Sequence, residues 1–243
     1  MNAECKGFAL VTGADRGLGQ ALAAGLLDRG WQVFAGQYMP EWPELDALHA
    51  RFPEALHLVP LDVGDEASVR AAAELTAAET DRIDLLINNA GVMSSTVFAT
   101  LREPQDYAEM HRLYDINALG PIRVVEAFLP LTDRSQMKRL CFVSSEAGSI
   151  NAARRTAWYG YCMSKAALNM AVRIMFNHLY PEGYTFRLYH PGWMRTYMMG
   201  ERNPEADLEP EEAAVYALSY FLAPRADEGR LVLRDYQGRE WPF

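Results

Sequence analysis

Tyr161 and Lys165 are the residue pair whose types and spacing best suit acid–base chemistry. They stand four residues apart in a stretch with a helical pattern, which predicts that both side chains lie on one face of a helix. A phenol with its ordinary pKa of about 10 exchanges protons poorly at neutral pH, whereas a neighbouring ammonium favours the phenolate. Only Lys6, Lys138 and Lys165 are lysines among 23 basic residues, so such a pair seldom arises by chance. The spacing indicates a tyrosine tuned for general acid–base catalysis.

A second chemical motif is the glycine-rich turn at 12–19, between the apolar run 8–11 and a stretch with helical character. Glycines in a strand-to-helix turn let the backbone approach a pyrophosphate and direct the first N–H groups of the helix at it. A tight turn that only packs helix against sheet is the alternative interpretation. The predicted contacts to a dinucleotide come from Gly13, Asp15, Arg16, Gly17, Leu18 and Gly19.

The choice of dinucleotide depends on the end of the second predicted strand, where an acidic residue usually binds the ribose hydroxyls of NAD. Residues 33–39 contain no acid, and the first one along the chain is Glu41. Arg16 offers a planar guanidinium that suits a 2′-phosphate. We therefore predict NADP(H). NAD(H) stays the alternative, because Arg16 can also be a solvated turn residue and no second basic residue occurs at 37–39.

Short apolar runs alternate with amphipathic stretches along the whole chain, which is the pattern of a βαβ series. Runs that are apolar on every residue, such as 140–143, are typical of a parallel sheet covered by helices on both faces. We predict an α/β protein: a single Rossmann-fold domain over 1–243 with a doubly wound parallel sheet of about seven strands. The predicted strands are 7–12, 31–37, 56–61, 83–88, 139–144, 184–190 and 230–234, and the predicted helices are 17–29, 43–51, 65–79, 104–129, 157–180 and 209–222.

Composition excludes several classes of protein. The 243 residues are 50% hydrophobic and 23% charged with a formal net charge of -9, which excludes a disordered or disulfide-framework chain and argues against nucleic-acid or anionic-membrane partners. The three cysteines and five histidines lack the spacing of a zinc site, so no metal is predicted. With no leader pattern and no apolar run of about 18 residues, we expect a cytoplasmic protein.

Six motifs occur in a fixed order along the chain. They are Thr12-Gly13-x-x-x-Gly17-x-Gly19, Asn88-Asn89-Ala90-Gly91, Asn117, Ser144-Ser145, Tyr161-x-x-x-Lys165, and Pro191-Gly192 through Thr196. Together they resemble the short-chain dehydrogenase/reductase family, in its branch of about 250 residues. The spellings at 143–150 and 190–196 are similar to carbonyl reductases of the C-factor and sniffer type.

The resemblance implies a role for each matching residue. Tyr161 would exchange a proton with the substrate oxygen, and Lys165 would lower the pKa of Tyr161 and bind the nicotinamide ribose. Ser145 would hydrogen-bond the substrate carbonyl; it is preferred over Ser144 because the active serine precedes its glycine by three. Asn117 would hold a water that relays protons to Lys165. Further cofactor contacts would come from Asp62, Val63, Asn89, Ala90, Gly91, Pro191, Gly192 and Thr196.

The substrate is expected beyond the carboxyl ends of the strands. The segments there suggest an apolar wall for a hydrophobic ketone or aldehyde, although several of their side chains could simply pack. The residues predicted to line it, besides Ser145, are Met93, Trp193, Met194 and Tyr197. A substrate lid is predicted near 196–208. Arg154-Arg155 belongs to a substrate-side loop or to a surface excursion.

Two functions stay open on sequence alone. The first is an NADP(H)-dependent oxidoreductase acting on a carbonyl or secondary alcohol, and the second is a catalytically silent dinucleotide-binding sensor or scaffold of the same fold. A serine hydrolase is excluded because no G-x-S-x-G elbow surrounds Ser145. A homodimer and a homotetramer are both compatible with the sequence.

Overall fold

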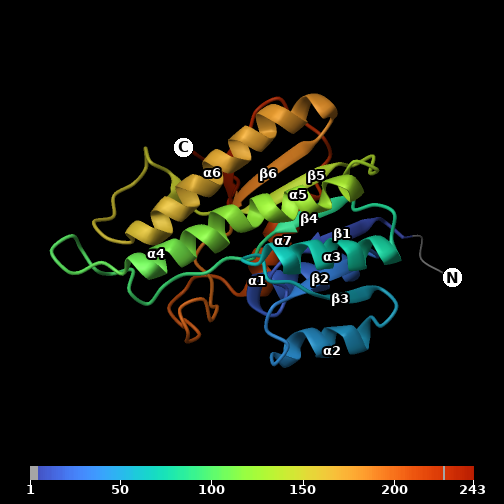
Figure 1. The fold of residues 1–243 in the computed structure, drawn as a ribbon, viewed down its shortest axis with the longest axis horizontal. Helices are drawn as coiled ribbons and strands as arrows, with labels where there is room; N and C mark the ends of the chain where they lie inside the picture. The colour runs from blue at the N-terminus through green and yellow to red at the C-terminus, as the bar shows by residue number, and fades with distance from the viewer. Residues whose placement is uncertain (1–4, 227) are drawn as a thin grey trace.

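One sheet of eight strands runs through the residues that the structure describes, 5–226 and 228–243 of a computed structural model (Figure 1). The strand order is β3-β2-β1-β4-β5-β6-β7-β8, and all neighbours are parallel except β7 and β8. The strands are β1 Phe8–Val11, β2 Gln32–Gln37, β3 Leu56–Pro60, β4 Leu85–Asn88, β5 Arg139–Val143, β6 Thr185–His190, β7 Leu233–Asp235 and β8 Glu240–Trp241. The α-helices are α1 Gly17–Leu27, α2 Pro43–Arg51, α3 Glu66–Glu79, α4 Tyr107–Tyr114, α5 Gly120–Thr132, α6 Tyr159–Leu179 and α7 Pro210–Phe221.

Helices cover both faces of the sheet. Side chains from α1, α2 and α7 form one core with Ala9 and Val11 of β1, whereas α3, α5 and α6 form the other with Leu10 (Figure 1). Successive residues of a strand point to opposite faces, so a strand buried on both sides needs apolar residues at every position. The structure confirms the predicted doubly wound Rossmann fold.

The sheet has one strand more than predicted. The last predicted strand, 230–234, is β7 Leu233–Asp235, and β8 Glu240–Trp241 returns antiparallel beside it. The turn between them is closed by the Asp235 carboxylate, which accepts hydrogen bonds from the backbone N–H groups of Gln237 and Arg239. Gly238 takes the left-handed conformation that this turn requires, with φ at 81°. So short a strand carries too few residues to show an alternating pattern.

The predicted helix 104–129 is interrupted. It begins as α4, passes through a π-helical turn, Asp115–Leu119, and continues as α5. The backbone N–H of Gly120 bonds to the carbonyl of Asp115, five residues back instead of four. Pro121 has no N–H to offer the carbonyl of Asn117 four residues before it, which breaks the α-helical ladder at this point.

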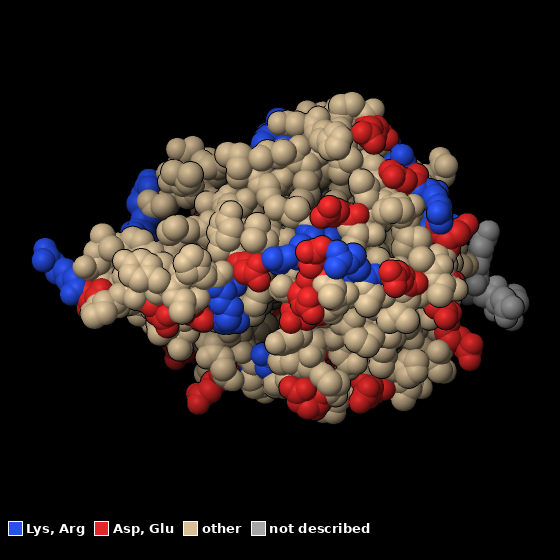
Figure 2. All heavy atoms as spheres, viewed as in Figure 1, with Lys and Arg blue, Asp and Glu red and all other residues tan. Residues whose placement is uncertain are grey.

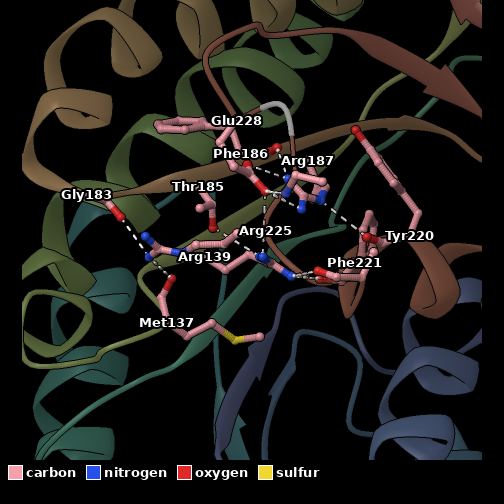
Figure 3. A network of polar contacts seen from close by, with 12 residues as sticks. Met137, Arg139, Gly183, Thr185, Phe186, Arg187, Tyr220, Phe221, Arg225 and Glu228 are labelled. Carbon is pink, nitrogen blue, oxygen red and sulfur yellow. Dashed lines mark hydrogen bonds and ion pairs between the residues drawn. The ribbon is translucent and has the colours of Figure 1, made fainter.

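A buried arginine cluster lies at the amino ends of β5 and β6 (Figure 3). Arg187 forms a two-pronged ion pair with Glu228, with both N–O distances at 2.7 Å. Arg139 donates to the carbonyls of Phe221 and Ala223 at the end of α7, each at 2.7 Å. Cations suit the carbonyl end of a helix, so the cluster joins α7 to the sheet.

The surface in the orientation of Figure 1 carries acidic and basic residues interspersed, including a central strip where both signs alternate (Figure 2). Arg123 on α5 forms an ion pair with Asp115, with an N–O distance of 2.6 Å. Within residues 5–226 and 228–243, no helix is both long and apolar enough to span a membrane.

Candidate active site

Four residues from three segments of the chain meet at the carboxyl ends of β4 and β5. Ser145 follows β5, Tyr161 and Lys165 lie on the first turns of α6, and Asn117 lies in the π-helical turn. Gly91, just after β4, sits between them: a Cβ there would come 3.2 Å from Asn117 Oδ1 and 3.5 Å from Lys165 Nζ. The structure therefore brings together the four residues that were predicted to be catalytic.

Lys165 is buried, with 3% of its surface exposed. Its Nζ donates to the carbonyl of Val143, the last residue of β5, at 3.1 Å. Burial lowers the pKa of Lys165 to about 8. The backbone of α6 can come this close to the serine loop because residue 148 is glycine, where a Cβ would lie 2.7 Å from the Lys165 carbonyl oxygen.

Tyr161 is also buried, and burial raises its pKa to about 12, although a hydrogen bond with the Ser145 side chain acts in the opposite direction. Lys165 Nζ lies 5.8 Å from the centroid of the Tyr161 ring. Removal of the phenol from water therefore sets the direction of the net pKa shift in this structure, and the lowering of the Tyr161 pKa by Lys165 stays a prediction. The tyrosine is protonated and ready to donate at neutral pH.

The two adjacent serines have different partners. The Ser144 hydroxyl donates to Asn169 Oδ1 at 2.6 Å, and Asn169 Nδ2 donates in turn to the carbonyl of Gly148 at 3.1 Å. Ser144 thus ties β5 to α6. The Ser145 hydroxyl accepts from the backbone N–H of Ala147 at 3.1 Å and lies beside Tyr161, where it can also contact a substrate oxygen.

The Asn117 side chain braces the site. It donates to the carbonyl of Val92 at 2.9 Å and to the Ser164 hydroxyl at 3.0 Å, and it accepts from the backbone N–H of Val92 at 2.8 Å. With its side chain engaged, only its backbone carbonyl, deprived of a helical donor by Pro121, is suited to hold a water. Sequence analysis missed Ser164 and the π-helical turn; Pro121 was the available signal for the turn.

Residues directly after β4 hold the glycine turn in place through hydrogen bonds. Asn89 Nδ2 donates to the carbonyls of Thr12 and Gly13 at 2.9 and 3.1 Å, and the backbone N–H groups of Asn89 and Ala90 donate to the Thr12 hydroxyl, each at 3.0 Å. Gly13 has φ at 63°, and a Cβ there would lie 2.9 Å from Ala90 Cα. Asn89 and Ala90, predicted cofactor contacts, therefore shape the turn through their own hydrogen bonds.

The N-terminus of α1 is open to an anion. Its first residue is Gly17, with φ at 56°, and neither a side-chain cap from Arg16 nor an acidic residue occupies the first turn. Gly19 lies against the Gly13 carbonyl so closely that no Cβ fits there. Leu18 is buried below the turn. Free N–H groups at a helix N-terminus beside a glycine turn match the geometry that holds a pyrophosphate.

Two predicted cofactor residues have structural partners. The Asp15 carboxylate accepts from the backbone N–H groups of Tyr38 and Met39, at 2.8 and 2.7 Å, and so fixes the segment that follows β2. Asp62 Oδ1 accepts from the N–H of Gly64 at 2.8 Å. Val63 is buried against the π-helical turn near Gly120. Asp15 thus joins the glycine turn to the segment after β2, whereas Asp62 and Val63 lie directly after β3.

Arg16 lies beside two aromatic rings that also contact each other. Its guanidinium carbon is 4.2 Å from the centroid of Trp42 and 5.6 Å from that of Tyr197, and the two ring centroids are 5.2 Å apart. Tyr197, predicted to contact substrate, instead contacts Arg16 of the glycine turn and Trp42 in this structure. Trp42 was not predicted, because nothing local in the sequence indicates that Arg16 contacts one residue 26 positions later and another 181 positions later.

The contact therefore joins the glycine turn to the segment after β2 and to the predicted lid, 196–208.

The predicted lid lies against the glycine turn. A Cβ on Gly17 would come 3.4 Å from the Thr196 methyl group. The segment closes on itself through a parallel bridge between Met194 and Leu208, and Met194 packs against the core beside α1 and α7. Trp193 is 54% exposed. Of Trp193, Met194 and Thr196, only Trp193 is classed as exposed to solvent.

The loop that leads into the predicted lid starts from a tight turn at the end of β6. Pro191 is buried, and Gly192 has φ at 85°. A Cβ on Gly192 would lie 2.8 Å from the ring of Tyr236. Both residues therefore direct the chain from β6 across the carboxyl edge of the sheet.

Apolar side chains pack around Tyr161. Val97, Ala147 and Tyr161 form a small buried cluster separate from the two main cores. Met93, Trp158 and Cys162 pack against it, partly exposed. Met93 is where sequence analysis predicted a substrate contact, whereas Trp158 was missed.

Comparison with known proteins supports the arrangement. The sequence profile of the short chain dehydrogenase family matches residues 7–207. The C-signal protein of Myxococcus xanthus is 43% identical over 164 residues, which cover 68% of this chain and 95% of that protein. NADPH-bound carbonyl reductase from chicken fatty liver superposes with a TM-score of 0.86 at 28% identity, covering 99% of this chain and 100% of the other.

A carbonyl reductase from Pseudomonas aeruginosa in complex with NADP is 30% identical, with a TM-score of 0.79 over 98% of this chain and 99% of the other. The two structural matches extend over nearly the whole fold, and the family match at 7–207 spans the positions of all the motifs named above. The resemblance found in the sequence is confirmed: the chain belongs to the short-chain dehydrogenase family.

Proposed function

We propose that this protein is an NADP(H)-dependent oxidoreductase that interconverts a hydrophobic carbonyl compound and its alcohol, with Tyr161 as the general acid and base. The observation that carries the proposal is the convergence of Ser145, Tyr161 and Lys165 beside the open N-terminus of α1. Relatives bound to NADP or NADPH and described as carbonyl reductases support it.

The reaction in the reducing direction needs a proton at the carbonyl oxygen. The bound cofactor supplies the hydride to the carbonyl carbon. Ser145 and Tyr161 offer two hydroxyls to the oxygen, which orients the substrate and stabilises the charge that develops there. Tyr161 then donates its proton to that oxygen. Its pKa of about 12 keeps it protonated at neutral pH until this step.

Lys165 has two tasks in this proposal. A pKa of about 8 lets its ammonium lose and regain a proton near neutral pH, so it can restore the proton that Tyr161 gives up. Its Nζ also lies at the floor of the site, where it can bind a ribose hydroxyl. The Asn117 backbone carbonyl would hold a water that connects Lys165 with solvent.

The cofactor preference rests on Arg16. Its guanidinium lies at the outer end of the glycine turn, where a 2′-phosphate could replace its aromatic neighbours as partner. We expect tighter binding of NADPH than of NADH, measured by calorimetry, and loss of most of that difference in Arg16→Ala. Arg29→Ala, an exposed position at the far end of α1, is the matched control. Equal affinities for the two cofactors in the unmodified protein would refute the preference.

The reaction itself is tested with a panel of ketones and aldehydes while the absorbance of NADPH is followed. Consumption of NADPH with matching formation of alcohol is the expected result. Cofactor binding without turnover of any carbonyl or alcohol would instead favour the silent sensor or scaffold. In that case the segment 196–208, which we propose as the substrate lid, would close over the cofactor alone.

A further inference from the structure

Trp158 has a backbone conformation that large residues rarely adopt. Its φ and ψ are 71° and 29°, in the left-handed region. For a bulky residue this conformation is unfavourable and persists only where the surroundings enforce it. The N–H of Trp158 donates to the carbonyl of Val97 at 2.7 Å, and its carbonyl accepts from the N–H of Cys162 at 2.9 Å. The strain therefore sits at the start of α6, three residues before Tyr161.

The strained backbone directs the indole toward the catalytic tyrosine. The rings of Trp158 and Tyr161 have centroids 6.1 Å apart and an interplanar angle of 80°. Phe98, from the segment after β4, lies 6.0 Å from the indole, again at 80°. Trp158 thus contacts both the ring of Tyr161 and that of Phe98, an exposed aromatic residue.

Arg155 contacts the indole and links it to the serine loop. Its guanidinium carbon is 4.7 Å from the centroid of the Trp158 ring. The same guanidinium makes two hydrogen bonds with the Glu146 carboxylate, at 2.9 and 2.6 Å. Glu146 directly follows Ser145. The serine loop and the start of α6 are therefore joined through one cation that also fixes the plane of the indole.

A carbonyl oxygen that reaches both Ser145 and Tyr161 must bring its carbon substituents beside the apolar side chains around Tyr161. Met93 there is flexible and can adapt to different shapes. Trp158 is larger, and its orientation is set by hydrogen bonds on both sides of its backbone and by Arg155. A rigid wall discriminates by size more strongly than a flexible one.

We propose that Trp158 is a specificity-determining residue, whose fixed indole admits carbonyl compounds with one small substituent and rejects those with two bulky ones. This inference rests on the proposed reductase function. It accounts for the strained backbone, because a relaxed conformation would direct the indole elsewhere. It also assigns Arg154-Arg155 to the substrate side, with Arg155 as the residue that positions Trp158.

The test compares benzaldehyde, with hydrogen as its second substituent, with benzophenone, which has two phenyl groups. Trp158→Gly removes the indole and fits the left-handed backbone without strain. We expect its ratio of kcat/KM for benzophenone to that for benzaldehyde to rise at least about tenfold over the unmodified protein. Trp158→Phe, which keeps a smaller ring, should give an intermediate ratio. Lys138→Gly is the matched control.

Lys138 is the other non-glycine residue with a positive φ within the described ranges, at 45°, and it lies before the amino end of β5. Lys138→Gly should change stability alone and leave the substrate ratio as it was. An unchanged ratio in Trp158→Gly, with the protein folded as judged by circular dichroism, would overturn the inference.

A binding measurement distinguishes failure of the proposed reductase function from failure of this inference. If the unmodified protein reduces neither compound, binding of each to the NADP⁺-loaded protein is measured by calorimetry. A shift of the affinity ratio toward benzophenone in Trp158→Gly would still support a size-selecting wall. An unchanged ratio, or no binding of either compound to either variant, would count against it.

Discussion

Strand β5 has a buried cation at each end, and the two are held in different ways. At the amino end, Arg139 is 2% exposed and donates to Thr185 Oγ1 at 3.0 Å as well as to two carbonyls at the end of α7 (Figure 3). At the carboxyl end, Lys165 is 3% exposed and donates from Nζ to the carbonyl of Val143. The arginine meets several acceptors in a fixed geometry, whereas the lysine directs its ammonium into the candidate active site.

The difference follows from the chemistry of the two side chains. A guanidinium has five N–H donors in a rigid plane and stays protonated, even where burial lowers its pKa as it does for Arg139. An ammonium is a compact charge whose pKa moves readily, and burial brings that of Lys165 to about 8. Arginine therefore suits a permanent structural charge, and lysine suits a site where a proton is exchanged. A chain with 23 basic residues but only three lysines makes this division visible.

The largest expected effect comes from exchanging the two cations. Lys165→Arg should lower turnover by about 10²–10⁴-fold, because the guanidinium neither fits the ammonium position nor exchanges a proton. Arg139→Lys should keep turnover per folded molecule and lose about 1–3 kcal/mol of unfolding free energy through unpaired carbonyls. Steady-state kinetics and urea unfolding of both variants measure this. Equal loss of turnover in the two variants would contradict the assignment of a structural cation to the amino end of β5 and a proton-exchanging one to its carboxyl end.

Glu228→Gln should come next, as a loss of about 3 kcal/mol in unfolding free energy, because Arg187 and Arg139 are then buried without their carboxylate. Arg187 holds the pKa of Glu228 below its ordinary value despite burial. The stabilisation is therefore present above the ordinary pKa of a glutamate and is lost as pH falls through the lowered one. Urea unfolding should show the difference between variant and unmodified protein narrowing in acid; a constant difference would contradict the ion pair.

Lys165→Met should abolish turnover and yet stabilise the fold at pH 7 by more than about 1 kcal/mol. The folded pKa of Lys165, about 8, lies below the ordinary value of 10.5 for a lysine, so charging this residue opposes folding. That penalty is complete below pH 8 and disappears as pH rises through the ordinary pKa. The free energies of unfolding of Lys165→Met and the unmodified protein should therefore differ at neutral pH and become equal at strongly alkaline pH. Destabilisation at neutral pH would mean that the ammonium is structural.

The smallest effect is expected for Arg225→Ala. This exposed arginine donates from one nitrogen to the carbonyls of Gln136, Met137 and Gly183 beside the buried cluster (Figure 3). Water can replace it there, so thermal unfolding should register a loss of only about 0.5–1 kcal/mol. A loss of unfolding free energy as large as that of Arg139→Lys would contradict the expectation that the exposed arginine contributes less to stability than the buried one.

The sequence predicted those features that depend on neighbours in the chain. The strands are continuous apolar runs, the glycine turn is a local pattern, and Tyr161 with Lys165 needs only the periodicity of one helix. The partners of Arg139 are 46 to 84 residues away, so its role could not be foreseen. The raised pKa of Tyr161 has the same origin, because burial is a tertiary property that no spacing reveals.

Trp158 and the π-helical turn at 115–119 were both missed, but only the turn had a local sign in the sequence. The left-handed conformation of Trp158 is imposed by Val97 from another element, and tryptophan itself gives no local sign of it. The helical turn had a sign in Pro121, which removes one donor from the ladder. Helical periodicity across 104–129 concealed it, since the apolar pattern continues through the turn.

Tyr161→Phe tests most directly whether the carboxyl end of β5 is a site of proton transfer. The measurement is the single-turnover rate of NADPH oxidation with a carbonyl compound that the unmodified protein reduces, together with NADPH affinity. Removing the hydroxyl while keeping the ring should lower the rate by about 10²-fold or more and leave NADPH binding intact. Turnover equal to that of the unmodified protein would contradict Tyr161 as the acid.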